Sequence, residues 1–520
     1  MQISVAECLS LSARRVPHAV ALIFEGRSWT YQALDAQSSA LAGRLEALGL
    51  KRHDRITLYG PNSVQWVVAY YAIMKMGGVV NPLNLMLTPR EAAFAMKDCG
   101  ARAIVGDSTK VAALQALPGE TDVRHVIAWG LPQSADALDF DAMTQGLALS
   151  GANDAGSRSI QRAYPRADIA LDDPCTVGYT SGTTGLPKGA LLSHRAIVLN
   201  VEMTALMHVR TAADIMVSAL PCSHVYGNVA MQSIFARGGT VVLHKTFNAA
   251  AVLASIAQYR ATLLEGVPTM YMYLLNEPTL SQYDVSSLTR CTVGGQTMPV
   301  ATMRAVEAAF GCPLLELWGM TELGGLGTTH GFYGPRKLGS IGIALPHVQL
   351  RIADLEQPER ELPAGSTGEL QVRGPITMRE YVGQPEATAA TLLAGGWLRT
   401  GDLARVDEDG FVFVVDRLKD LIITAGFNVY PAELERVIAE HPGVAMVAVG
   451  AIKDSLKGEL AKAYVVAKAG VELNLDELHD HCRERLAAYK MPRAFQIVAD
   501  LPKTSTGKVL RRELHTLDVH

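Results

Sequence analysis

Short apolar segments alternate with helical periodicity along the first half of this 520-residue chain. Segments 55–59, 78–80, 103–106 and 126–129 have the length and composition of buried strands, and a helix is expected over 64–76. Strands that alternate with helices predict parallel βαβ units, in which helices cover both faces of a sheet. The first half of the chain is therefore predicted to form layered α/β subdomains.

The pattern changes after residue 365. Segments 368–373, 404–406 and 411–415 are predicted to be strands with no helix between them. The sequence Asp407-Glu408-Asp409-Gly410 is typical of a hairpin turn. This part of the chain is predicted to be a β-rich subdomain.

A separate small α+β unit is predicted from residue 418 onward. It has apolar strands around 444–449 and 461–466, and a helix for which Asn474 is the expected N-cap. The predicted fold class is α/β. A large N-terminal domain, 1–417, would contain layered α/β subdomains and the β-rich subdomain, and a small mobile α+β C-terminal domain would occupy 418–520.

Composition excludes several classes of protein. The 47 Lys and Arg against 51 Asp and Glu give a net charge of −4, which provides no field for gathering nucleic acid. The most apolar stretch, 67–80, is interrupted by Lys75 and Gly77 and is too short to span a membrane. The seven cysteines are scattered without a C-x-x-C pair, so neither a disulfide scaffold nor a zinc ribbon is expected. We expect a cytoplasmic protein without a membrane span.

The most informative segment is 179–189, Tyr-Thr-Ser-Gly-Thr-Thr-Gly-Leu-Pro-Lys-Gly. Its glycines allow close approach of the backbone, and its hydroxyls and Lys188 supply the donors and positive charge that a polyphosphate needs. A Walker loop is excluded because proline precedes the lysine and glycine follows it. A nucleophile elbow is excluded because the residues two before and two after Ser181 are not glycine. A phosphate-binding loop is the favoured interpretation.

This segment resembles the phosphate-binding signature of the adenylate-forming superfamily of acyl-CoA synthetases, peptide-synthetase adenylation domains and beetle luciferases. Further blocks follow in the order of that superfamily, and together they cover the chain from about 179 to 508. They are 221–227, Gly294-Gly295-Gln296, Trp318-Gly319-Met320-Thr321-Glu322, Thr400-Gly401-Asp402, 416–420, 426–431 and Thr506-Gly507-Lys508. Chance agreement of so many ordered blocks is negligible, and the chain is identified as a member of that superfamily.

The resemblance implies an acyl-CoA synthetase that uses ATP, Mg²⁺ and CoA. A carboxylate oxygen would attack the α-phosphate of ATP, pyrophosphate would leave, and CoA would then take the acyl group and release AMP. By resemblance, Lys508 would reach the α-phosphate and the substrate carboxylate, His224 would act as a gate over that carboxylate, and Glu322 and Thr180 would support Mg²⁺. The C-terminal domain would rotate between the two half-reactions about Lys419.

The residues that would bind nucleotide and CoA follow from the same resemblance. Asp402 would accept hydrogen bonds from the ribose hydroxyls, Arg417 would donate to them, and Gly426 would line the tunnel for pantetheine. The complete set is Thr180, Ser181, Gly182, Thr183, Thr184, Lys188, Gly295, Gln296, Trp318, Gly319, Met320, Thr321, Asp402, Arg417 and Gly426.

Two positions depart from the commonest pattern of the superfamily, and by similarity both lie along the pocket for adenine and the acyl group. Trp318 stands where tyrosine is usual, and Gln296 follows Gly-Gly where a small residue and an acid are frequent. By similarity the walls of the acyl pocket would be Tyr226, Asn228, Val267, Trp318, Met320 and Leu326, mostly apolar or aromatic and without Arg or Lys. A monocarboxylic substrate is therefore expected, either a medium- to long-chain fatty acid or an aryl acid. The alternative is a stand-alone adenylation enzyme that loads a carrier protein; a homodimer is compatible with both.

Overall fold

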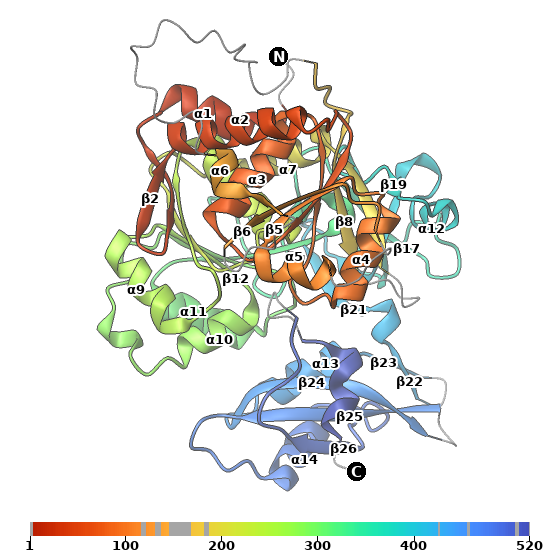
Figure 1. Cartoon of the computed structure of the whole chain (residues 1–520). Helices are drawn as coiled ribbons and strands as arrows, with labels where there is room; N and C mark the ends of the chain where they lie inside the picture. Colours follow the sequence, from red (N-terminus) through yellow and green to blue (C-terminus); the bar gives the residue numbers. More distant parts are fainter. Residues whose placement is uncertain are drawn as a thin grey trace, which may run out of the picture.

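The computed structural model describes residues 4–115, 121–130, 137–144, 168–180, 187–424, 427–454, 458–504 and 509–518. Two large sheets with helices, a smaller sheet and a separate C-terminal unit make up this part of the chain (Figure 1). The predicted α/β class, with a large N-terminal part and a small α+β C-terminal part, is confirmed.

The first large sheet has nine strands, of which the six central ones run parallel. In spatial order they are β16 (Ile343–Ala344), β15 (Gly325–Thr329), β14 (Leu314–Met320), β13 (Arg290–Val293), β12 (Leu263–Gly266), β10 (Ile215–Ser218), β11 (Thr240–Leu243), β1 (Val20–Phe24) and β2 (Arg27–Thr30). The antiparallel strands β16, β15 and β2 lie at its two ends. Helices α9 (Ala249–Tyr259), α10 (Pro268–Leu275) and α11 (Val300–Phe310) pack their apolar side chains against one face.

The second large sheet has eight strands, and its antiparallel edge carries the predicted phosphate loop. In order they are β19 (Glu380–Tyr381), β9 (Lys188–Ser193), β8 (Pro174–Thr180), β4 (Val79–Pro82), β3 (Arg55–Tyr59), β5 (Ala103–Asp107), β6 (His125–Trp129) and β7 (Leu138–Asp139). Strands β3 to β8 run parallel to one another. Strand β9 pairs antiparallel with β8, and β19 pairs antiparallel with β9. Helices α4 (Pro89–Asp98) and α5 (Ser108–Gln115) pack on one face of this sheet.

Five helices form the layer between the two large sheets, and their side chains share one core with both sheets. They are α1 (Glu7–Arg15), α2 (Tyr31–Ala47), α3 (Val64–Lys75), α7 (His194–Met207) and α8 (Val225–Arg237), with the short α6 (Phe140–Thr144) beside α2. Helix α3 is buried along its whole length, including Trp66, Tyr70 and Tyr71. The one lysine of this helix, Lys75, is fully buried and donates to the Asp35 carboxylate at 2.6 Å. The predicted layered arrangement, with strands alternating with helices, is therefore confirmed.

The β-rich subdomain is a four-stranded antiparallel sheet. Its strands are β17 (Gln349–Ala353), β18 (Gly368–Arg373), β20 (Leu398–Val406) and β21 (Val412–Arg417), and the predicted hairpin turn joins the last two. In that turn the Gly410 amide donates to the Asp407 carbonyl at 3.0 Å. The expectation of no intervening helix is wrong, because α12 (Pro385–Thr391) lies between β18 and β20. None of its residues is buried, so it has no apolar stripe for a sequence pattern to reveal.

The C-terminal unit has a sheet and two cores of its own. It contains β22 (Ile422–Thr424), β23 (Phe427–Val429), β24 (Val444–Asp454), β25 (Gly458–Ala467), β26 (Ala494–Ile497), α13 (Pro431–Ala439) and α14 (Leu475–Arg483). Asn474 caps α14 as predicted, since its side chain accepts from the Asp476 amide at 2.9 Å. Figure 1 shows this unit as a separate layer below the N-terminal part.

One arginine joins three segments where the chain enters the C-terminal unit. Strand β21 ends at Arg417, the 3₁₀ turn η4 spans Leu418–Asp420, and β22 already belongs to the C-terminal sheet. Arg511, on the 3₁₀ helix η5 (Arg511–Leu517), lies 3.5 Å from the Asp416 carboxylate and 3.0 Å from that of Asp420. Its other terminal nitrogen lies 2.6 Å from the Glu435 carboxylate on α13. The domain boundary at 417/418 and the mobility of the C-terminal domain stay predictions.

Three short 3₁₀ helices complete the described elements. They are η1 (Leu280–Gln282), η2 (Thr321–Leu323) and η3 (Ala394–Gly396). No helix in the described ranges combines the length and apolar composition that crossing a bilayer demands.

Candidate active site

The predicted phosphate loop is the connection of a hairpin at the antiparallel edge of the second large sheet. Strand β8 ends at Thr180, β9 begins at Lys188, and these two residues face each other in the pairing register. Residues Ser181, Gly182, Thr183 and Thr184 lie outside the described residues, as do Gly426 and Lys508. The predicted loop therefore leaves the sheet after Thr180 and rejoins it at Lys188.

Lys188, Tyr381 and Glu322 lie together beside this hairpin. The Lys188 ammonium lies 5.3 Å from the centroid of the Tyr381 ring, and the Tyr381 hydroxyl donates to Glu322 Oε1 at 2.7 Å. Strand β19 places Tyr381 there by pairing with β9. Burial raises the pKa of the Glu322 carboxyl, while the hydrogen bond from Tyr381 and the charge of Arg417 lower it. The arrangement joins a cation, a hydroxyl donor and a buried carboxylate.

A glycine on β8 brings the Thr180 end of the hairpin close to Glu322. A Cβ atom at Gly178 would lie 2.6 Å from Thr321 Cγ2, so a larger residue would force either the Thr321 side chain or β8 to shift. Thr180 follows two residues later on β8, and Glu322 is adjacent to Thr321. A hydroxyl and one carboxylate suit Mg²⁺, which usually takes one or two protein carboxylates and completes its shell with substrate phosphates and water. In the described part of the chain no group of three or more acidic, His or Cys ligands offers another metal site.

Asp402 lies between Arg417 and Trp318 at the edge of the β-rich subdomain. Its carboxylate is almost completely buried, with Oδ2 2.7 Å from the Trp318 indole nitrogen and Oδ1 2.9 Å from Arg417 Nε. Asp402 and Arg417 face each other in the antiparallel pairing of β20 and β21. The contact with Arg417 is an ion pair without hydrogen-bond alignment, and Oδ1 accepts no hydrogen bond from any described residue. A buried acceptor therefore remains for a ligand.

The remaining predicted nucleotide residues lie at the carboxyl ends of parallel strands. Gly295 follows β13 with a φ of +94°, in the left-handed region that favours glycine, and Gln296 is half-buried beside it. A Cβ atom at Gly295 would lie 3.5 Å from Val267, which follows β12. Trp318, Gly319 and Met320 end β14, and Thr321 begins η2. Ligands of open α/β sheets bind at this edge.

His224 is the N-cap residue of helix α8. It is exposed at the N-terminus of α8, where its Nδ1 accepts from the Tyr226 amide at 3.3 Å and caps the helix. Its gating role stays a prediction.

The side chain of Tyr226 is anchored by a buried polar network. Its hydroxyl lies 2.7 Å from Thr292 Oγ1, and Thr292 donates to Glu265. Glu265 in turn pairs with Arg210, and both side chains of this pair are inaccessible to solvent. The Asn228 amide oxygen accepts from Tyr70 and Gln232 in the core. Two of the predicted acyl-pocket walls are thus held by polar contacts behind them.

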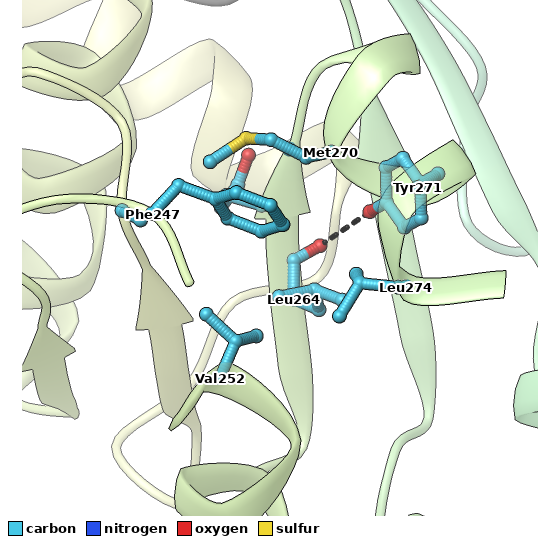
Figure 2. Close-up of a pocket in the computed structure, with 9 residues that line it drawn as sticks. Phe247, Val252, Leu264, Met270, Tyr271 and Leu274 are labelled. Carbon is cyan, nitrogen blue, oxygen red and sulfur yellow. Dashed lines mark hydrogen bonds between the residues drawn. The ribbon is translucent and has the colours of Figure 1, made fainter. Parts of the chain in front are cut away.

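Figure 2 shows a narrow pocket. Its cavity volume is about 10 Å³, which is room for about one water molecule. Apolar side chains of Phe247, Val252, Leu264, Met270 and Leu274 line it, together with Tyr271, whose hydroxyl donates to the Leu264 carbonyl at 3.1 Å. Most of these residues belong to the core under α9–α11, whereas Tyr226 and Leu326 belong to the core between the sheets. The pocket adjoins the predicted wall Tyr226, because the Tyr226 hydroxyl lies 3.4 Å from the carbonyl of Gly266 in the pocket lining.

Sequence reasoning missed Tyr381 and the contact made by the Trp318 indole. Tyr381 lies in a two-residue strand nearly 200 positions from its pairing partner, so nothing in the local sequence ties it to the phosphate loop. The sequence shows that tryptophan replaces the usual tyrosine at position 318, but it does not show which way the indole ring points. Only the pairing of β14 with β15 and of β20 with β21 sets that direction.

Comparison with known proteins finds relatives along the whole chain. Residues 9–382 match the family described as AMP-binding enzyme, and residues 433–508 match the AMP-binding enzyme C-terminal domain. The chain is 36% identical to a feruloyl-CoA synthase of Amycolatopsis sp, over 96% of each protein. It is 34% identical to a long-chain-fatty-acid–CoA ligase of Bacillus subtilis (strain 168), over 97% of this chain and 93% of the relative. The crystal structure of ATP-bound MatB from Rhodopseudomonas palustris superposes with a TM-score of 0.89 at 31% identity, covering 99% of both chains.

Proposed function

The chain belongs to the AMP-binding enzyme family, and from this premise we propose that it is an acyl-CoA synthetase of fatty or aryl acids. In the first step a carboxylate oxygen of the acid attacks the α-phosphorus of ATP, and the bond to the leaving pyrophosphate breaks. In the second step the CoA thiolate attacks the acyl carbon, and AMP leaves. The enzyme is thus an AMP-forming acid–thiol ligase.

In this proposal the polyphosphate of ATP lies at the hairpin between β8 and β9. Lys188 supplies positive charge there, and its contact with the Tyr381 ring holds the ammonium beside Glu322. Glu322 and the Thr180 hydroxyl would hold Mg²⁺, which would neutralise charge on the phosphate oxygens. The loop 181–184 would donate to the same oxygens. Lys508 would reach the α-phosphate and the substrate carboxylate in the first step.

The ribose of the nucleotide is assigned to Asp402 and Arg417. The buried Asp402 Oδ1 has an unused acceptor position, and a ribose hydroxyl is a donor that would fill it. Arg417 has a partly exposed side chain that can donate to a second ribose oxygen. This unfilled acceptor beside an arginine is the single observation that carries the proposal.

The acid proposed as substrate has one carboxylate and an apolar body. The walls assigned by similarity contain no cation that could pair with a second carboxylate, and burying an unpaired one would be costly. The segment 221–228 carries no acidic residue that could meet a substrate amine, which argues against an amino acid. Two relatives are named for a long-chain fatty acid and for a feruloyl group, and both acids fit this description.

Other parts of the proposal concern the whole molecule. The chain would divide into domains 1–417 and 418–520, with rotation about Lys419 in η4 and with Gly426 in the pantetheine tunnel. A cytoplasmic location accords with cysteines that are all buried and outside any disulfide bond. A homodimer is compatible with this activity but is not needed for it.

The proposal is tested by measuring AMP formation with and without CoA across acetate, malonate, benzoate, cinnamate, octanoate and palmitate. We expect CoA-dependent AMP release and a thioester product, with preference for the apolar acids. Asp402→Asn should lower the activity strongly, whereas the exposed control Asp480→Asn should not. Acyl-adenylate that accumulates unchanged by CoA would favour the carrier-loading alternative, and a preference for acetate or malonate would contradict the apolar pocket.

A further inference from the structure

We propose that Trp318 is a positioning residue, whose indole N–H orients the Asp402 carboxylate so that Oδ1 faces the ribose of ATP. The inference rests on the proposed ribose-binding role of Asp402. It concerns the one position of the nucleotide site where the sequence departs from the usual tyrosine. The tryptophan at this position would thereby affect how ATP binds.

The two oxygens of the Asp402 carboxylate contact different side chains. The indole nitrogen holds Oδ2 at 2.7 Å, and Arg417 Nε lies 2.9 Å from Oδ1 without forming an aligned hydrogen bond. An arginine beside a carboxylate favours the two-pronged arrangement in which both oxygens accept. By occupying Oδ2, the indole prevents that arrangement, and Oδ1 stays beside Arg417 without accepting a hydrogen bond from a described residue.

The Trp318 ring is held in place by the neighbouring strand. A Cβ atom at Gly327 on β15 would lie 2.6 Å from Trp318 Cζ3 and 3.1 Å from Cε3, so the absent side chain makes the space for the ring. The register of β14 and β15 shifts between Trp318 and Gly319, an irregularity that re-aims a side chain. The side chain is buried, and its only polar atom is the N–H that meets Asp402.

A tyrosine or phenylalanine at this position would not provide the same contact. The indole N–H lies on the side of the five-membered ring, whereas a phenol hydroxyl lies at the far end of its ring. With the ring in the same space, neither Tyr nor Phe places a donor on Asp402 Oδ2. In both variants the carboxylate is expected to turn so that both of its oxygens accept from Arg417.

The test compares ligands that differ only in the ribose hydroxyls. Equilibrium binding of AMP and of 2′,3′-dideoxy-AMP is measured by calorimetry for the wild type and for Trp318→Phe. The adenine and the phosphate are common to both ligands, so the ratio of their dissociation constants reports the contacts of the ribose hydroxyls. We expect the preference for AMP to fall about tenfold in Trp318→Phe, the size typical of a lost hydrogen bond to a charged group. Trp318→Tyr should behave in the same way.

Three further variants separate the inference from the proposed function. Asp402→Asn should reduce the preference for AMP, and if it does not, the ribose-binding role of Asp402 is wrong. If Asp402→Asn reduces the preference but Trp318→Phe keeps the wild-type ratio, only the role of Trp318 is overturned. The double variant should lose no more preference than Asp402→Asn alone, because both changes act on one contact. Trp397→Phe is the matched control, since Trp397 stacks between Arg351 and Arg373 away from this carboxylate.

A merely structural role for Trp318 predicts a different outcome. Disturbed packing would weaken AMP and dideoxy-AMP by the same factor, so the ratio would stay at the wild-type value and the inference would be refuted. Thermal unfolding of each variant shows whether it is folded. A Trp318→Phe protein that unfolds at assay temperature is replaced by Trp318→Tyr, for which the same ratio decides.

Discussion

Glu316 is a buried carboxyl that should make the stability of the protein fall with rising pH. Its side chain lies on β14 and is 2% exposed, and Oε2 accepts no hydrogen bond from any described residue. Burial raises its pKa from 4.5 to about 8. At about 1.36 kcal/mol for each pH unit, this difference corresponds to a cost of about 5 kcal/mol for full ionisation in the folded state. Such a cost is a large share of the roughly 5–15 kcal/mol typical of folded domains.

The sign follows from proton binding. Between pH 4.5 and about 8 the folded chain keeps a proton on Glu316 that the unfolded chain has lost. The associated stability is fully present below pH 4.5 and is lost as the pH rises through the folded pKa near 8. Glu316→Gln stays neutral throughout, so it should gain on the wild type by several kcal/mol between pH 5 and 9.

The assay is urea unfolding of both proteins at whole pH values from about 5 to 9. Glu408→Gln is the control, because Glu408 is exposed in the hairpin turn and should follow the wild-type curve. Free-energy profiles of Glu316→Gln and the wild type that run parallel to within about 1 kcal/mol would refute the reasoning. They would mean that water or local rearrangement solvates this carboxyl.

Three further changes have defined outcomes. Glu265→Leu should lower the free energy of unfolding by about 3–5 kcal/mol in a denaturation assay, because it leaves Arg210 charged and without its carboxylate partner in the core. The double variant Glu265→Leu/Arg210→Met should cost far less, and equal losses in the two variants would contradict this reasoning. Lys508→Ala should abolish adenylate formation yet spare thioester formation from supplied acyl-AMP, and equal loss of both half-reactions would argue against its assignment. Gly426→Leu should slow thioester formation while pyrophosphate exchange continues, since a side chain would obstruct the thiol; unchanged CoA kinetics would disprove it.

Strands and turns were predictable where local chemistry dominates. The predicted strand at 55–59 is β3, and the turn at Asp407–Gly410 forms as expected. Both are short segments whose composition alone specifies their conformation. The predicted helix at 64–76 is α3, which ends at Lys75.

The candidate site was less predictable because its contacts join distant strands. Motif order supplied the identities of Asp402, Arg417 and Glu322, but not the neighbours that orient them. The indole of Trp318 reaches Asp402 across 84 positions, and the hydroxyl of Tyr381 reaches Glu322 across 59. Such pairs are set by sheet register, which no local pattern encodes. The helix α12 was missed for a different reason, since all of its residues are accessible to solvent.

The ion pairs of Arg511 have a consequence for the turnover rate of the enzyme. Its contact with Glu435 stays within the C-terminal unit, but its contact with Asp416 reaches back to strand β21. If the C-terminal domain rotates as proposed, the ion pair between Arg511 and Asp416 would break in each catalytic cycle. The ion pair between Arg511 and Glu435 would stay intact, because both residues belong to the rotating domain. The Asp416 carboxylate is buried, so dissolved salt would screen this contact only weakly. The rate of domain rotation would thereby depend on the cost of separating this buried pair, and it would be nearly independent of ionic strength.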